Sequence, residues 1–177
     1  MNWLGDHTSS WLPGLDTGST QKVILTSSDR RVAIDETGRP RLFDVQDPLL
    51  SGLTPVLAGT LGDVSYSGVR ADPISGVVYE SLRPVIIQLN NEQFIPVSSA
   101  IQVLDFIEEH QFCGRCGQPT TPSPSDRGRY CEPCGLTQYP RISPCVIVLI
   151  TRGDEILLAR APRFVDGMYS TLAGVVE

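Results

Sequence analysis

The sequence lacks a long apolar run. Its longest uninterrupted apolar stretch, Cys145 to Ile150, is far shorter than the roughly 20 residues that a membrane helix needs. The first residues, Met1 to His7, contain no basic cluster followed by an apolar segment, so no secretory signal is predicted. The hydrophobic content of 41% is ordinary for a globular protein. We therefore expect no membrane span and, by default, a cytoplasmic location.

The first part of the chain has few cations. Residues 1–112 contain seven Lys and Arg against fourteen Asp and Glu, a balance of −7, whereas residues 113–177 contain seven Arg against six acids, a balance of +1. Broad nucleic-acid binding depends on cations that neutralise phosphates, so this acidic part argues against such binding there. We interpret the acids as a solvated face.

Cysteines are also few, but four of the five are regularly spaced. Cys113 and Cys116 form one Cys-x-x-Cys pair, and Cys131 and Cys134 form a second, with fourteen residues between the pairs. This spacing is typical of a zinc site rather than of a disulfide framework. Cys145 lies outside the pattern and is expected to be a buried apolar filler.

One Cys-x-x-Cys pair on each side of a metal ion gives four sulfur ligands, which suits the tetrahedral geometry of Zn²⁺. Gly117 and Gly135 follow the two pairs and free the backbone to curl beneath the sulfurs. Four thiolates fill the coordination sphere, which leaves no position for a catalytic water, so we predict a structural zinc ribbon. The arginines expected to offset the negative charge of the four thiolates are Arg115, Arg127, Arg129 and Arg141.

Before the ribbon, short β-favouring runs alternate with turn residues, which predicts a small β-rich domain. The expected strands are at 23–26, 31–35, 41–45, 54–57, 76–79 and 84–89.

An amphipathic helix is predicted from about Ser99 to His110, because apolar residues recur there at helical spacing and Ser98 and Ser99 offer N-caps. This helix ends just before Cys113 and therefore links the β-rich domain to the ribbon.

After Pro140 the pattern changes. The run from Cys145 to Ile150 is typical of a strand covered on both faces, and Gly153-Asp154 predicts a hairpin turn. Returning strands are expected at 156–159 and 169–176.

Several motifs together resemble one family. They are Phe112-Cys-Gly-x-Cys-Gly, Tyr130-Cys-x-x-Cys, the string QYPRISP at 138–144, LLAR at 157–160 and LAGVVE at 172–177. In order and spacing they are similar to the bacterial NADH pyrophosphatases, which are Nudix hydrolases also regarded as decapping enzymes for NAD-capped RNA. The resemblance is continuous from about His110 to residue 177 and weak before it.

The resemblance implies an α+β fold in three parts. These are a β-rich N-terminal domain over 1–111, a four-cysteine zinc ribbon over 112–140, and the first strands of an incomplete Nudix α/β/α fold over 141–177. It also implies NAD(H) or a related dinucleotide, and possibly NAD-capped RNA, as the partner. Because the apolar run from Cys145 to Ile150 lacks a covering helix, the C-terminal segment is expected to be exposed, swapped or dimeric, and a homodimer is predicted.

The implied reaction is hydrolysis of the pyrophosphate in NAD(H) to NMN(H) and AMP. It requires Mg²⁺ or Mn²⁺ held by the glutamates of the Nudix box. Here the box begins at Gly174 and reaches only Glu177, which falls at a variable position, so no catalytic glutamate is present. The 177 residues alone are expected not to hydrolyse NAD(H).

Further site residues are implied only by the resemblance. Ala173 is expected to offer its backbone carbonyl to the catalytic metal, while Tyr139 and Asp126 are expected to contact substrate, with Asp126 where glutamate is usual. Arg83, in Ser81-Leu82-Arg83, is a further expected substrate contact. Packing for Tyr139 and a plain surface charge for Arg83 are the competing interpretations.

Two other functions stay open. The chain also suits a non-catalytic zinc-ribbon module that binds a protein or RNA partner, because four arginines lie near the cysteines. A Nudix hydrolase for another nucleoside diphosphate derivative is the third interpretation.

Overall fold

The structure, a computed structural model, describes residues 20–123 and 126–176 and has the mixed α+β architecture that the sequence predicts. The chain divides into two compact units, Met1–Pro140 and Arg141–Glu177. None of the helices in the described part of the chain is long and apolar enough to cross a bilayer.

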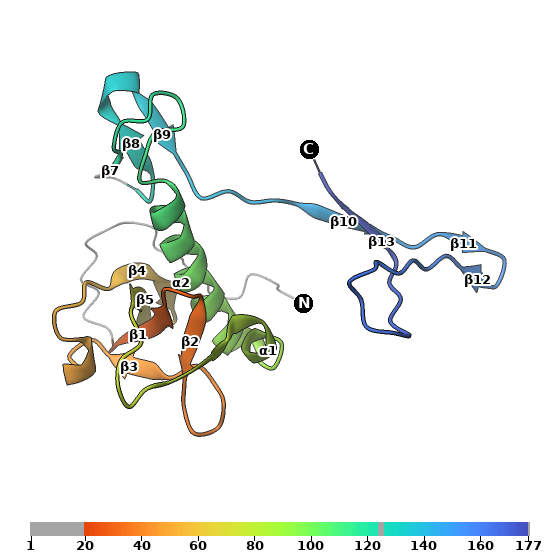
Figure 1. Ribbon diagram of the computed structural model, residues 1–177, viewed down its shortest axis with the longest axis horizontal. Coiled ribbons are helices and arrows are strands. Elements are labelled where there is room, and N and C mark those ends of the chain that lie inside the picture. Colours follow the sequence, from red (N-terminus) through yellow and green to blue (C-terminus); the bar gives the residue numbers. More distant parts are fainter. Residues whose placement is uncertain (1–19, 124–125, 177) are drawn as a thin grey trace. The chain divides into compact units, whose positions relative to one another are not determined.

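The first unit contains a six-stranded sheet (Figure 1). Its strands are β1 (Thr20–Ser27), β2 (Arg31–Ile34), β3 (Leu42–Asp44), β4 (Val56–Leu61), β5 (Val64–Ala71) and β6 (Val78–Ser81). They are ordered β4-β5-β1-β2-β6, and β3 also pairs with β1. The β1–β5 pair is parallel and the other pairs are antiparallel.

Strand β1 is central because its side chains are apolar on both faces of the sheet. Val23 and Leu25 belong to one buried cluster, which includes Phe43, whereas Ile24 between them belongs to a second cluster on the opposite face. A strand buried on both faces has a continuous apolar run instead of an alternating one. The run VILT in β1 has this character.

Helix α2 (Asn91–Glu109) covers one face of the sheet and packs on β4, β5 and β1. Gly68 in β5 permits this close packing, since a Cβ there would lie 3.0 Å from Leu104 Cδ1 and 3.1 Å from Ala100 Cβ. A short 3₁₀ helix, η1 (Pro48–Leu50), and helix α1 (Leu82–Ile86) complete the first part of this unit.

An ion-pair network fixes the polar side of α2 to the sheet. Arg70 of β5, whose side chain is 7% exposed, donates to Asp105 at 2.8 Å and also to Glu108. Burial of the guanidinium opposes its charge, but the hydrogen bonds that it donates to the two carboxylates outweigh that effect, so the pKa of Arg70 is raised. The helix is therefore held by both an apolar and a charged contact.

Two expectations about this region are wrong. The run at 84–89, expected as a strand, begins within α1, where Pro84 lies in the first turn and its missing N–H costs no helical hydrogen bond. Helix α2 begins at Asn91, eight residues before Ser99, because the side chain of Asn90 caps it by accepting the N–H of Gln93 at 3.0 Å. Strand β5, rich in small and polar residues, was not expected.

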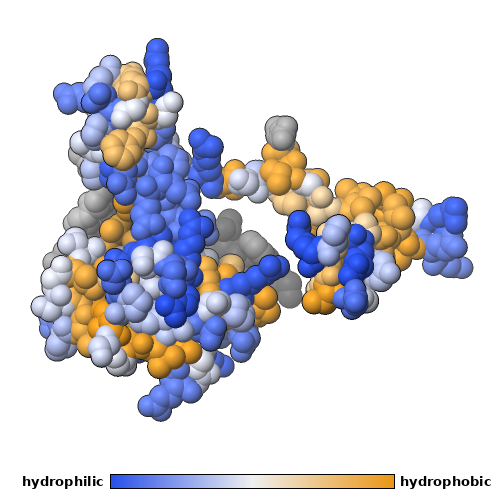
Figure 2. Space-filling view, in the orientation of Figure 1, coloured by the Kyte–Doolittle hydropathy of each residue, from blue (hydrophilic) through white to orange (hydrophobic). Residues whose placement is uncertain are grey.

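The second unit consists of two strand pairs. Strand β10 (Cys145–Val148) pairs with β13 (Leu172–Val175), and β11 (Thr151–Arg152) pairs with β12 (Glu155–Ile156) across the predicted turn at Gly153. Apolar side chains of 141–177 lie on the surface, as the orange regions in Figure 2 show. The run from Cys145 has the pattern of a strand covered on both faces, but it is exposed, as expected for a segment without its covering helix. The expectation of a buried Cys145 is wrong.

Candidate metal centre

The ribbon is a small sheet closed by two cysteine turns. Its elements are β7 (Thr121–Pro122), β8 (Arg129–Cys131), the 3₁₀ helix η2 (Glu132–Cys134) and β9 (Leu136–Gln138). The first turn is closed by the N–H of Gly117, which donates to the carbonyl of Cys113 at 2.8 Å. Gly117 and Gly135 have φ of 71° and 62°, in the left-handed region that favours glycine, as their place after each pair predicts.

The four predicted ligands come together in space. The sulfur atoms of Cys113, Cys116, Cys131 and Cys134 all lie within 4.8 Å of one another, and Cys116 Sγ and Cys131 Sγ are 3.5 Å apart. A tetrahedral zinc with Zn–S bonds of about 2.3 Å separates its sulfurs by about 3.8 Å. The donor set and its spacing thus fit a structural Zn²⁺ with four thiolate ligands.

The surroundings of the four thiols shift their pKa values in different directions. Backbone N–H groups of Arg115 and Cys116 lower the pKa of Cys113 to about 7, whereas the neighbouring Cys116 sulfur and burial raise the pKa of Cys134 to about 12. Burial is also the main cause that raises the pKa of Cys131. Four like-charged thiolates this close cannot coexist without a cation, so zinc binding must release protons from the cluster.

Thr120 joins the ribbon to the end of α2. Its buried hydroxyl donates to the carbonyl of His110 at 2.5 Å and accepts from Arg129 Nε at 3.0 Å. Its backbone N–H donates to the carbonyl of Gln111 at 2.9 Å. This role of Thr120 could not be predicted from the sequence, because nothing in the Pro-rich segment around it indicates a long-range hydrogen bond.

Arg127 joins the ribbon to the sheet. Its Nη2 donates to the carbonyl of Ala58, at the point where β4 shifts register against β5 between Leu57 and Gly59. Such a bulge leaves the extra residue out of the strand ladder. Burial lowers the pKa of Arg127 to about 10. The predicted offset of the thiolate charge by arginines stays a prediction.

The structure brings two of the predicted substrate residues together. The hydroxyl of Tyr139, a residue that is 54% exposed, donates to Asp126 Oδ2 at 3.1 Å. Asp126 Oδ1 accepts the N–H of Gly128 at 2.8 Å. That N–H, then the hydroxyl of Ser123, then Tyr139 lower the pKa of Asp126, and the carboxylate in turn raises the pKa of Tyr139. We call these two residues the Asp126–Tyr139 pair.

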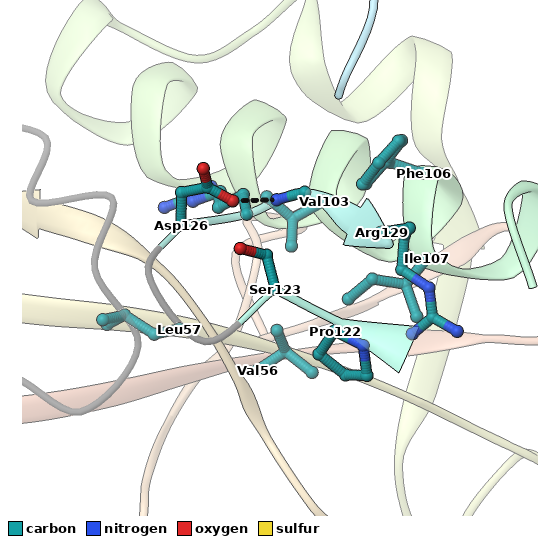
Figure 3. A pocket seen from close by; sticks show the side chains of 11 residues that line it. Val56, Leu57, Val103, Phe106, Ile107, Pro122, Ser123, Asp126 and Arg129 are labelled. Carbon is teal, nitrogen blue, oxygen red and sulfur yellow. Dashed lines mark hydrogen bonds between the residues drawn. The ribbon is translucent and has the colours of Figure 1, made fainter. Parts of the chain in front are cut away.

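A cavity of about 280 Å³, which Asp126 helps to line, lies between β4, α2 and the ribbon (Figure 3). Its walls are mostly apolar, and the dashed line in Figure 3 marks the hydrogen bond from Gly128 to Asp126 at its edge. The lining residues include Val56, Leu57, Phe106, Ile107 and Arg129.

The other two predicted site residues lie elsewhere. Arg83 is exposed on α1, which comes before α2 in the sequence. Asp126 and Tyr139 come after the last residue of α2. The intervening helix of 19 residues is about 28 Å long. Ala173 lies in β13 opposite Ile147, in the second unit.

Comparison with known proteins identifies the ribbon. The family profile described as "NADH pyrophosphatase zinc ribbon domain" matches residues 108–139, which include all four clustered cysteines and the Asp126–Tyr139 pair. Thus the zinc ribbon predicted from the cysteine spacing is confirmed both by geometry and by family.

The curated relatives share a longer segment. The chain is 50% identical over 107 residues to the "NAD-capped RNA hydrolase NudC" of Pseudomonas entomophila strain L48, covering 60% of this chain and 39% of that protein. The proteins of the same description in Pseudomonas fluorescens Pf-5 and Stutzerimonas stutzeri A1501 are 49% identical over 104 residues and 47% identical over 109. These matches cover 59% and 62% of this chain and 38% and 39% of the two relatives.

The chain therefore spans about two fifths of the length of the relatives that it matches, 39% in the first case. Within that span the predicted resemblance is confirmed by two independent comparisons. Over the part that it shares with these relatives, the chain is similar to the NADH pyrophosphatases, and residues 108–139 match the zinc ribbon of that family.

Proposed function

We propose that this chain serves the hydrolysis of the pyrophosphate bond in NAD(H), giving NMN(H) and AMP, including the removal of NAD caps from RNA. The four-cysteine ribbon carries this proposal, because its sulfur cluster and its family match concern the same residues, 108–139. The relatives' printed name, NAD-capped RNA hydrolase, supports the substrate.

Within this activity, the ribbon's role is to position substrate. A zinc ion with four thiolate ligands has no open position for water, so it supplies stability and not chemistry. The exposed ring of Tyr139 and the carboxylate of Asp126 are the proposed substrate contacts on the ribbon, and Arg83 is a further, separate one.

A catalytic Mg²⁺ or Mn²⁺ belongs to the same proposal. Such ions take about six oxygen ligands. Within residues 20–123 and 126–176, the four cysteines form the only group of three or more side chains placed to ligate a metal. The described residues therefore do not by themselves fit this ion, and only the backbone carbonyl of Ala173 is proposed to contact it.

The remaining parts of the proposal concern organisation. We propose the division into an N-terminal domain over 1–111, a ribbon over 112–140 and the start of a Nudix domain over 141–177, in a cytoplasmic homodimer. The exposed apolar strands of 141–177 support association, because apolar surface gains free energy when it is covered.

Binding to capped RNA tests the proposal. The zinc-loaded chain is titrated with one RNA in two forms, with an NAD cap and with a 5′-triphosphate, and with NADH alone. We expect NADH and the capped RNA to bind, and Tyr139→Ala to weaken both about tenfold. AMP release with Mn²⁺ is measured in parallel and is expected to be nil for the 177 residues.

Equal affinity for both RNA forms, without binding of NADH, would contradict the proposal. That result would favour the alternative of a non-catalytic ribbon that binds RNA. Preference for another nucleoside diphosphate derivative over NADH would instead favour a Nudix hydrolase of different specificity.

A further inference from the structure

Gly128 occupies a crowded place beneath the Asp126–Tyr139 pair. A Cβ at this position would lie 2.6 Å from Thr137 Cγ2, 2.9 Å from Asp126 Oδ1 and 3.2 Å from Tyr139 Cε1. Real Cβ atoms essentially never approach other heavy atoms within 3.0 Å. Gly128 is buried, so a side chain could not turn toward solvent to avoid these atoms.

The need for glycine here is steric rather than conformational. Gly128 does not have the positive φ that Gly117 and Gly135 have, so any residue could adopt its backbone conformation. What a side chain would displace are the two halves of the pair, the carboxylate of Asp126 and the ring of Tyr139. Its N–H also donates to Asp126 Oδ1 at 2.8 Å, which orients the carboxylate toward the tyrosine.

The turn that carries Gly128 is anchored on the preceding residue. Arg127 donates to the carbonyl of Ala58 in β4, so the turn is held to the sheet on one side while Gly128 meets β9 on the other. The backbone of the turn is therefore tied to the sheet, so a methyl group at position 128 would displace the side chains of Asp126 and Tyr139.

We propose that Gly128 is a positioning residue, whose missing side chain lets the Tyr139 hydroxyl reach the Asp126 carboxylate and so holds the two as one substrate-contacting unit. The consequence for NADH rests on the proposed function. The hydrogen bond between Tyr139 and Asp126 is independent of the proposed function, and it is measured separately.

The test is Gly128→Ala, compared with Gly114→Ala as the matched control. Gly114 lies in the same ribbon without a positive φ, and a Cβ there would meet only Gln138 Nε2, at an ordinary 3.7 Å. Both variants and the wild type are labelled with 3-fluorotyrosine, and the ¹⁹F signal of Tyr139 is assigned by its loss in Tyr139→Phe. Zinc content is determined for each protein.

In the wild type and in Gly114→Ala, we expect the pKa of Tyr139 to be higher than that of an exposed tyrosine, because ionisation would place a phenolate beside the Asp126 carboxylate. In Gly128→Ala, with zinc retained, we expect the pKa of Tyr139 to fall back toward that of an exposed tyrosine. NADH affinity is expected to fall about tenfold with it. An unchanged titration of Tyr139 in Gly128→Ala would overturn the proposal.

A second variant covers the case in which Gly128→Ala does not fold. Adding Thr137→Ser removes Cγ2, the atom in closest conflict, and leaves the conflicts with Asp126 and Tyr139. The double variant is expected to keep zinc and still show the lowered pKa of Tyr139, and a wild-type titration would again overturn the proposal. If the wild type does not bind NADH at all, the proposed function fails, while the titration still decides the role of Gly128.

Discussion

The β domain, described over residues 20–111, and the ribbon, residues 112–140, are stabilised in different ways. The β domain buries aliphatic and aromatic side chains on both faces of its sheet. In the described part of the ribbon, the buried side chains are those of Cys113 and Cys131 and of the polar Thr120 and Ser123, and Gly128 is the remaining buried residue. A segment this short cannot bury enough apolar surface to offset its conformational entropy. Burial of apolar side chains therefore stabilises the β domain, whereas zinc stabilises the ribbon.

The largest expected effect comes from removing a zinc ligand. Cys131→Ser should reduce zinc content from about one ion per chain to nearly none and unfold the ribbon, because structural zinc contributes about 10–16 kcal/mol to such small units. Elemental analysis and near-ultraviolet circular dichroism measure the loss. Cys145→Ser is the control, since this exposed cysteine lies outside the cluster. If Cys131→Ser retained both its zinc and its fold, the ribbon would not depend on zinc for its stability.

The second largest expected effect is a loss of stability in the β domain alone. Phe43, 1% exposed, packs in the cluster of Val23 and Leu25, so Phe43→Ala should cost about 3–5 kcal/mol of unfolding free energy. Urea unfolding followed by circular dichroism measures it, with Phe94→Ala, at a residue 41% exposed, as the control. Zinc content should not change. Loss of zinc from Phe43→Ala would show that the ribbon depends on the apolar core.

A smaller effect is expected at the contact between the two regions. Arg127→Ala removes the donor to the carbonyl of Ala58 and should cost about 1–3 kcal/mol, the range for a buried polar group left without its partner. Arg115→Ala, at an exposed site in the same ribbon, should change stability little. Urea unfolding of the zinc-loaded proteins measures the difference. Equal stability of both variants would mean that Arg127 does not couple the regions.

The smallest effect is a dependence on pH. The folded chain lowers the pKa of Asp126, so this residue adds stability above the pKa of an unfolded aspartate, about 4, and loses it as pH falls through the folded value. Asp126→Asn should therefore be less stable than the wild type near pH 7, and the difference should shrink in acid. The free energies of unfolding of both proteins, measured across this pH range, give the difference in stability. A difference that grows in acid would contradict the assigned sign.

The cysteine site could be predicted from the sequence because its signal is local. Two Cys-x-x-Cys turns, each followed by glycine, describe the geometry of each half of the site without reference to the rest of the chain. Strands β1, β2 and β3 were predicted for a similar reason, because their apolar runs are bounded by turn residues. The helix–ribbon connection also followed from the order of the motifs.

The features that could not be predicted from the sequence depend on contacts between residues distant in the chain. Strand β5 has little apolar character, and its Gly68 is required only because α2 packs against it. The start of α2 was misplaced because Ser98 and Ser99 were interpreted as its N-caps, whereas Asn90 is the N-cap. The roles of Arg127 and Gly128 depend on Ala58, Thr137 and Tyr139, and no spacing rule links these positions.

Hydrogen exchange tests the difference between the β domain and the ribbon most directly. Amide exchange of the zinc-loaded protein and of the protein after chelation is followed by mass spectrometry of peptides from both regions. Removal of zinc should abolish protection in peptides from 111–138 while peptides from β1, β5 and α2 stay protected. Protection of the ribbon without zinc, or its loss from both regions together, would contradict the account.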